Sequence, residues 1–112
     1  EGVTNASYVW CPNVDFYPNS PRPSYASLYP GDNYVDWTCL DGYNWGGVDG
    51  QWTGWESWDQ VFEYSYGKLL EVAPSKPVMI GEFGSESRGA PAGTSKDTVL
   101  PSRTTLSLTP LT

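Results

Sequence analysis

Histidine is absent from the 112-residue chain, and its absence narrows the chemistry that the chain can perform. Histidine is the side chain that titrates nearest to neutral pH and the commonest metal ligand, so histidine-based triads and histidine metal sites are excluded. Acid or base catalysis must therefore depend on carboxylates.

Basic residues are scarce, because 6 Lys and Arg stand against 13 Asp and Glu. Nucleic acids and anionic membranes both need a basic surface, so neither is an expected partner. Long apolar runs are missing as well, so we expect neither a membrane span nor a signal peptide within the chain. The chain begins at Glu1 rather than at Met, from which we expect a processed or missing start.

Cysteine occurs only as Cys11 and Cys39, too few for a disulfide framework and without the spacing of a metal site. Both lie in strand-like segments, where a buried free thiol is the commoner state, although a bridge between neighbouring strands stays open. We expect no metal and no cofactor. Asn5-Ala6-Ser7 fits the N-glycosylation pattern, which is compatible with secretion.

Aromatic residues, in contrast, are abundant, with six Trp, eight Tyr and three Phe. A core of this size needs less aromatic surface than that. Indole and phenol rings pack well against the apolar faces of sugar rings. Together with the acidic charge balance, this excess favours a carbohydrate ligand over a nucleic acid.

Three strand-like segments occur along the chain. Residues 7–12 are aromatic and β-branched, residues 34–45 become polar as they end, and residues 76–82 contain a short apolar run. Residues 13–32 are rich in proline, which allows no more than about one helical turn at residues 24–28.

One amphipathic helix is predicted before the third strand. Ser57 and Gln60 match a capping box, apolar residues recur as far as Val72, and Pro74 ends the helix. The order strand, irregular crossover, strand, helix, strand suits parallel pairing and predicts the α/β class. Parallel sheets normally have both faces covered, so the chain is expected to be part of a larger domain.

Glu82 is the first candidate for chemistry, since it follows the apolar run of the third strand between the turn formers Gly81 and Gly84. Parallel α/β folds place reactive groups at the carboxyl ends of their strands. Tyr43 ends the preceding strand, so its hydroxyl is expected to hydrogen-bond Glu82 and to favour the charged carboxylate. That arrangement suits a nucleophile, and the alternative is a carboxylate in a structural ion pair.

A glycosidase that retains anomeric configuration needs a second carboxyl group roughly 5 Å from the nucleophile. Asp41 also lies near a strand end, but its place two residues before Tyr43 favours a structural hydrogen-bond role. Trp45, together with Trp52 and Trp55, is predicted to line a sugar cleft or to pack beneath a loop. Asn44 is a further candidate for substrate binding.

Four motifs, in this order, resemble the second half of glycoside hydrolase family 26: Tyr8-Val-Trp-Cys-Pro-Asn13, Tyr29-Pro-Gly-Asp32-Asn-Tyr-Val-Asp36-Trp, Asp41-Gly-Tyr-Asn-Trp45 and Lys76-Pro-Val-Met-Ile-Gly-Glu82-Phe-Gly-Ser. The resemblance covers roughly residues 5–96 and implies a partial (β/α)8 barrel that contains its fifth, sixth and seventh strands. It implies that Glu82 is the nucleophile and that Tyr43 orients it. It also implies a secreted enzyme acting on β-1,4-mannan, mixed-linkage β-glucan or β-1,3-xylan, without an obligate protein partner.

The chain departs from the family pattern in two places. The family's general acid/base is a Glu that follows a His on the fourth strand, and this sequence contains neither that segment nor any His. The second departure is the tail, because the family continues past the nucleophile into a helix and an eighth strand, and residues 96–112 show neither pattern. We therefore expect a catalytic portion at residues 1–95, inactive alone, and a divergent, irregular tail at residues 96–112. The rival interpretations are a non-catalytic carbohydrate-binding module, which would consist of antiparallel strands, and an inactive gene fragment.

Overall fold

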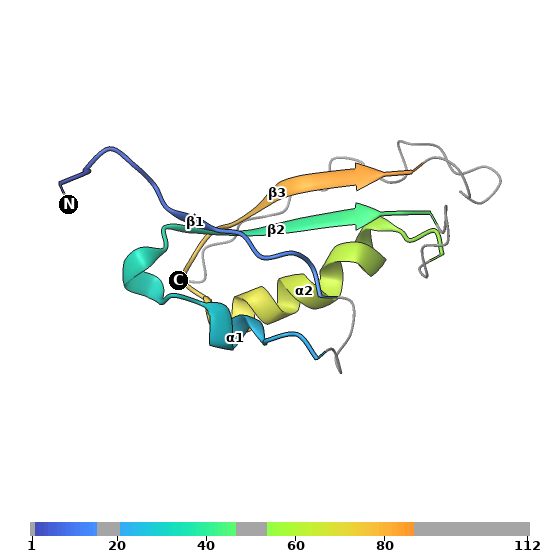
Figure 1. The fold of residues 1–112 in the computed structure, drawn as a ribbon, viewed down its shortest axis with the longest axis horizontal. Coiled ribbons are helices and arrows are strands. Elements are labelled where there is room, and N and C mark those ends of the chain that lie inside the picture. Colours follow the sequence, from blue (N-terminus) through green and yellow to red (C-terminus); the bar gives the residue numbers. More distant parts are fainter. Residues whose placement is uncertain (1, 16–20, 47–53, 87–112) are drawn as a thin grey trace.

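The computed structural model describes residues 2–15, 21–46 and 54–86 of the chain. Three strands form one parallel sheet in the order β1 (Val9–Trp10), β2 (Trp37–Asn44) and β3 (Val78–Ser85). The connection from β1 to β2 contains the short helix α1 (Tyr25–Leu28) and the 3-10 helix η1 (Asp32–Tyr34). Helix α2 (Trp58–Val72) connects β2 to β3 (Figure 1).

The predicted order of elements and the parallel pairing are both present in the described residues. This arrangement is compatible with a partial α/β fold, and its place in a (β/α)8 barrel stays a prediction. None of the described helices is long and apolar enough to cross a membrane. The predicted tail at residues 96–112 and the side chain of Trp52 lie outside the described residues.

Helix α2 begins at the predicted capping box. The Ser57 hydroxyl accepts a hydrogen bond from the Gln60 amide at 3.4 Å, and the Gln60 side chain accepts one from the Ser57 amide at 2.8 Å. These two bonds satisfy amide groups that have no partner within the helix. The helix ends at its C-cap, Ala73, one residue before Pro74, as the sequence predicts.

The core lies between β2 and α2. Helices α1 and α2 lie on the same side of the sheet (Figure 1). Leu40 of β2 and Leu69 of α2 are fully buried there. Because side chains alternate along a strand, the residues between the core positions point to the opposite face of the sheet. Three apolar residues of that open face are exposed by 38% or more: Val9, Trp37 and Met79.

The boundaries of all three strands differ from the prediction, and β1 spans only Val9–Trp10 instead of residues 7–12. Strand β2 begins at Trp37, because residues 32–34 form η1. Strand β3 does not end at Glu82 but continues to Ser85. Gly81 and Gly84, which are predicted to form turns, therefore lie within the strand. Gly81 lies where the pairing register between β2 and β3 shifts by one residue.

Of the two states that the sequence leaves open for Cys11 and Cys39, the structure has the less common one, a disulfide between neighbouring strands. Cys11 directly follows β1 and Cys39 lies in β2, so the parallel ladder brings together two residues that are 28 positions apart. Their Cα atoms are 4.2 Å apart. The bond therefore fastens the short strand β1 to the centre of the sheet.

Candidate active site

An irregularity in the ladder between β2 and β3 decides where Glu82 points. Leu40 pairs with Ile80, but the next pair is Asp41 with Glu82, so Gly81 is an extra residue of β3. An extra residue of this kind reverses the alternation of side chains beyond it. Without it, Glu82 would lie on the same face of β3 as Ile80, which packs against the core.

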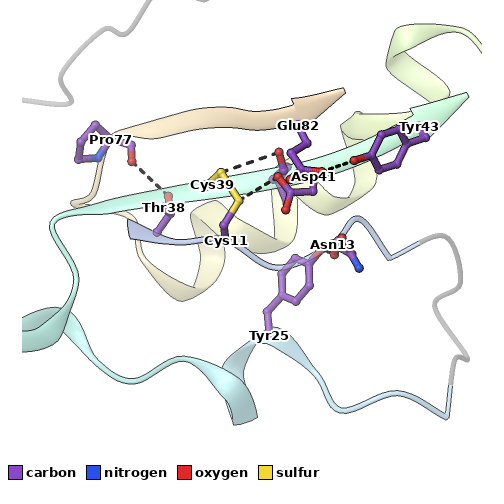
Figure 2. The surroundings of a disulfide bond; sticks show 10 residues. Cys11, Asn13, Tyr25, Thr38, Cys39, Asp41, Tyr43, Pro77 and Glu82 are labelled. Atoms are coloured by element: carbon purple, nitrogen blue, oxygen red, sulfur yellow. Dashed lines mark hydrogen bonds between the residues drawn. A yellow bond between two sulfur atoms is a disulfide. The ribbon is translucent and has the colours of Figure 1, made fainter. Parts of the chain in front are cut away.

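The contacts on either side of Gly81 agree with this reversal. Ile80 packs against the core before it, whereas after it Phe83 meets the Trp58 ring of α2, with ring centroids 5.9 Å apart. Glu82, between them, faces the open side of the sheet together with Asp41 (Figure 2). The sequence contains one signal of this bulge, a glycine inside an otherwise apolar strand.

Replacing Gly81 by alanine is expected to destabilise the protein by about 1–3 kcal/mol, the usual cost of overpacking. A Cβ atom at this position would lie 2.7 Å from the Asp41 carboxylate and 2.9 Å from Cys11 Sγ, and would also collide with Cys39 Sγ. Urea unfolding followed by tryptophan fluorescence measures the change.

Gly67→Ala is the matched control, because Gly67 lies exposed in α2 and a Cβ there meets nothing within 4 Å. That substitution should stabilise the helix by roughly 0.5–1 kcal/mol. If Gly81→Ala proved as harmless as Gly67→Ala, the close approach of β3 to the disulfide and Asp41 would be contradicted.

Tyr43 and Glu82, predicted to meet at neighbouring strand ends, are brought together by the structure. The Tyr43 hydroxyl donates a hydrogen bond to Glu82 Oε2 (Figure 2). This hydrogen bond, with smaller contributions from burial and from the negative charges of Glu82 and Asp41, raises the pKa of Tyr43 above 10.0. The bond holds one rotamer of the Glu82 carboxylate. A fixed rotamer suits a nucleophile, and the catalytic roles themselves stay predictions.

The Tyr43 pKa provides a test of this contact. Since the folded state favours the protonated phenol, the contact stabilises the fold fully below pH 10.0, and its contribution is lost as the pH rises through the raised pKa. Glu82→Gln removes the charged acceptor and should lower the Tyr43 pKa towards 10.0. The difference in tyrosinate absorbance between the chain and its Tyr43→Phe variant, followed as the pH rises, measures the titration of Tyr43 alone.

Tyr29 serves as the internal reference for that titration. Burial and a hydrogen bond to Asp32 raise the pKa of Tyr29 to about 12, and the hydroxyl lies 2.7 Å from Asp32 Oδ1. Glu82→Gln should leave Tyr29 unchanged. An equally unchanged Tyr43 would show that its hydroxyl does not contact Glu82 in solution.

Trp45 follows Tyr43 by two residues and lies beside it. The centroids of the two rings are 5.4 Å apart with an angle of 37° between their planes, and Trp45 is 51% exposed. An exposed indole next to the Tyr43–Glu82 pair is well placed to stack on a sugar ring. The predicted contact of Trp45 with substrate is therefore sterically feasible. Trp52, predicted to line the same cleft, lies outside the described residues.

Asn44, the other predicted substrate-binding residue, is not part of this group. It is 3% exposed and lies on the α2 side of β2, because it alternates with Tyr43. Its side chain donates to Ser85 Oγ at 3.0 Å and accepts from the amides of Gly46 and Glu56 at 3.2 and 2.9 Å. The geometry therefore corrects the assignment: Asn44 anchors the ends of the loop between β2 and α2.

Two further described carboxylates differ in their position relative to Glu82. Asp41 lies beside Glu82 on the ladder and on the same face, with its Oδ1 atom 3.1 Å from Cys11 Sγ. Glu56 belongs to the α2 side with Asn44, and its partial burial raises its pKa. Glu56 therefore lies on the opposite face of the sheet from Glu82.

No family model matches the chain. Among curated proteins, Endoglucanase H of Acetivibrio thermocellus is 44% identical over 88 residues, which is 79% of this chain. The chain spans 9% of the length of that protein. The chain is therefore similar to a short part of a protein that is named an endoglucanase.

Proposed function

We propose that the chain is the nucleophile-bearing part of a retaining glycoside hydrolase of family 26 that cleaves a β-linked polysaccharide. The observation that carries this proposal is the Tyr43–Glu82 hydrogen bond on the open face of a parallel sheet, beside the exposed Trp45. The similarity to Endoglucanase H supports the coarser part of the proposal, a glycoside hydrolase, and does not bear on family 26 or on the role of Glu82.

In this proposal, Glu82 attacks the anomeric carbon of the sugar and forms a covalent glycosyl-enzyme, which water then hydrolyses. Tyr43 occupies Oε2, so Oε1 is the oxygen that forms the bond to carbon. The leaving oxygen must receive a proton from a second carboxyl group. We propose that this group comes from another part of the longer enzyme.

The described strands all pair in parallel around a capped helix, which disfavours the alternative of an antiparallel carbohydrate-binding module. An inactive gene fragment would share the same fold and the same site. It differs from our proposal in one measurable respect, because its segment would not support catalysis even when the missing parts are supplied.

The substrate proposal rests on two sources that differ in detail. The printed name of the relative favours a β-glucan, whereas the motif resemblance favours β-1,4-mannan. Trp45 would stack on either sugar, because both have an apolar ring face. We also propose that the parent enzyme is secreted, a proposal that the disulfide supports, since such bonds persist in oxidising compartments.

The proposal can be tested with a chimera in which the matched segment of Endoglucanase H is replaced by that of this chain. The single domain around the segment is expressed and assayed on β-glucan and β-1,4-mannan, with the unmodified domain as control. We expect hydrolysis with retained anomeric configuration. A folded chimera that hydrolyses neither polysaccharide, beside an active control domain, would contradict the proposal and favour an inactive gene fragment.

A further inference from the structure

A second group of side chains on the open face has metal-ligating chemistry and is independent of the proposed hydrolase function. Cys39 and Asp41 lie two residues apart in β2 and therefore on one face, and Cys11 reaches the same place from the segment after β1 (Figure 2). One ligand atom from each of the three residues lies within 4.8 Å of the others. The 28-residue separation of the cysteines has no metal-binding signature in the sequence, so the ladder alone assembles the group.

We propose that Cys11, Cys39 and Asp41, after reduction of the disulfide, form a binding site for a thiophilic divalent cation such as Zn²⁺ or Cd²⁺. A dithiol reductant supplies two electrons and two protons, which break the sulfur–sulfur bond and leave two thiols, while the reductant closes to its own disulfide. Metal binding then displaces the two thiol protons, so both sulfurs bind as thiolates and Asp41 binds as a carboxylate.

The backbone around the three ligands is held by bonds that reduction does not touch. The Asp41 amide donates to the Pro12 carbonyl at 3.2 Å, and the Val14 amide donates to the Asp41 carbonyl at 2.9 Å. On the other side of Cys11, Trp10 pairs with Thr38 of β2. The ligands therefore stay close together once the sulfurs separate.

The ligand types fit a zinc-like ion. Zinc–sulfur bonds of about 2.3 Å in a tetrahedral site require sulfurs about 3.8 Å apart, so the two sulfurs, bonded to each other in the disulfide, must separate on reduction while the backbone around them stays in place. Two thiolates and one carboxylate favour Zn²⁺ or Cd²⁺ over Mg²⁺ and Ca²⁺, which prefer oxygen ligands alone. Three protein ligands leave the fourth position open to water.

The experiment uses the whole chain in two redox states. Samples reduced with a dithiol and then freed of it, and samples left oxidised, are titrated with Cd²⁺ under argon. The sulfur-to-cadmium absorption band in the near ultraviolet and equilibrium dialysis report binding. We expect one Cd²⁺ per reduced chain, displaceable by Zn²⁺, and no band in the oxidised chain.

Variants then identify the ligands. Cys39→Ser should abolish the band. Asp41→Asn should weaken the affinity of the reduced chain for Cd²⁺ at least about tenfold, because even the loss of a group that only supports a metal ligand lowers metal affinity by that much. Asp59→Asn on the exposed side of α2 is the matched control and should change nothing. Equal binding by oxidised and reduced chains, or unchanged affinity in Asp41→Asn, would overturn the proposal. Because two free thiols bind Cd²⁺ in an unfolded chain as well, the circular-dichroism spectrum of the reduced chain is recorded alongside, and the affinity of Asp41→Asn decides the outcome even if Cys39→Ser does not fold.

Discussion

Glu82→Gln is expected to lower turnover by at least about a thousandfold in the chimeric domain, with little change in its stability. The amide has nearly the shape of the carboxylate but does not attack the anomeric carbon. Because Glu82 is largely exposed on the open face, the substitution leaves no buried group without a partner. Turnover on β-glucan and the urea unfolding curve are the two measurements. A turnover within about tenfold of the parent would rule out the nucleophile assignment.

Two further variants separate a nucleophile from a residue that only supports the site. Glu82→Ala with added azide should form a glycosyl azide of inverted configuration, because the small anion enters the space that the carboxylate leaves. Glu63→Gln, on the exposed side of α2, is the matched control and should retain full turnover. Failure of azide to react in a folded Glu82→Ala variant, together with residual activity, would assign Glu82 a positioning role instead.

The parts of the fold that the sequence predicts are those that local patterns encode. The capping box at Ser57 and Gln60 and the stop before Pro74 depend on residues a few positions apart, so the bounds of α2 are readable from the chain. The neighbouring positions of the ends of β2 and β3 follow from parallel pairing of consecutive strands, a rule of topology, whereas the contact of the Tyr43 and Glu82 side chains also needs the extra residue Gly81.

Other features depend on register, which the sequence does not display. A glycine inside a strand can be a turn, a bulge or a close approach, and the pairing of Asp41 with Glu82 is what identifies Gly81 as a bulge. The same uncertainty of one residue decides on which face of β2 a side chain lies, so the burial of Asn44 on the α2 side cannot be read from the sequence. The disulfide likewise depends on which residues of β1 and β2 lie side by side.

The bulge, the disulfide and Asp41 form one packed unit beneath Glu82. Gly81 has no side chain, and the space that a Cβ would take is occupied by both cysteine sulfurs and the Asp41 carboxylate. The position of the candidate nucleophile is therefore tied to a cross-strand bond at the centre of the sheet. A change at any of these four residues is expected to move Glu82 relative to Tyr43, so the Tyr43 pKa reports on the whole unit.

The last prediction is that the 112 residues alone do not hydrolyse glycans and are at best marginally stable. Strands β1 and β3 are the edges of the described sheet, and unpaired strand edges favour aggregation over a monomeric fold. The open face also exposes Val9, Trp37 and Met79 to water. Catalysis fails for a separate reason: the Glu that follows a His in the family pattern has no counterpart in these 112 residues, and general acid assistance is worth on the order of a hundred- to ten-thousandfold.

The test compares the 112-residue chain with the chimeric domain under the same conditions. Sugar release from β-glucan and β-1,4-mannan is measured beside thermal unfolding and sedimentation. We expect release only from the chimera, and a broad transition or self-association in the isolated chain, because its apolar face and edges lack the neighbours that a barrel supplies. A monomer with a sharp cooperative transition would contradict the stability argument. Sugar release by the isolated chain that Glu82→Gln abolishes would instead show that the acid lies within these residues, with Asp41 as the first carboxylate to examine.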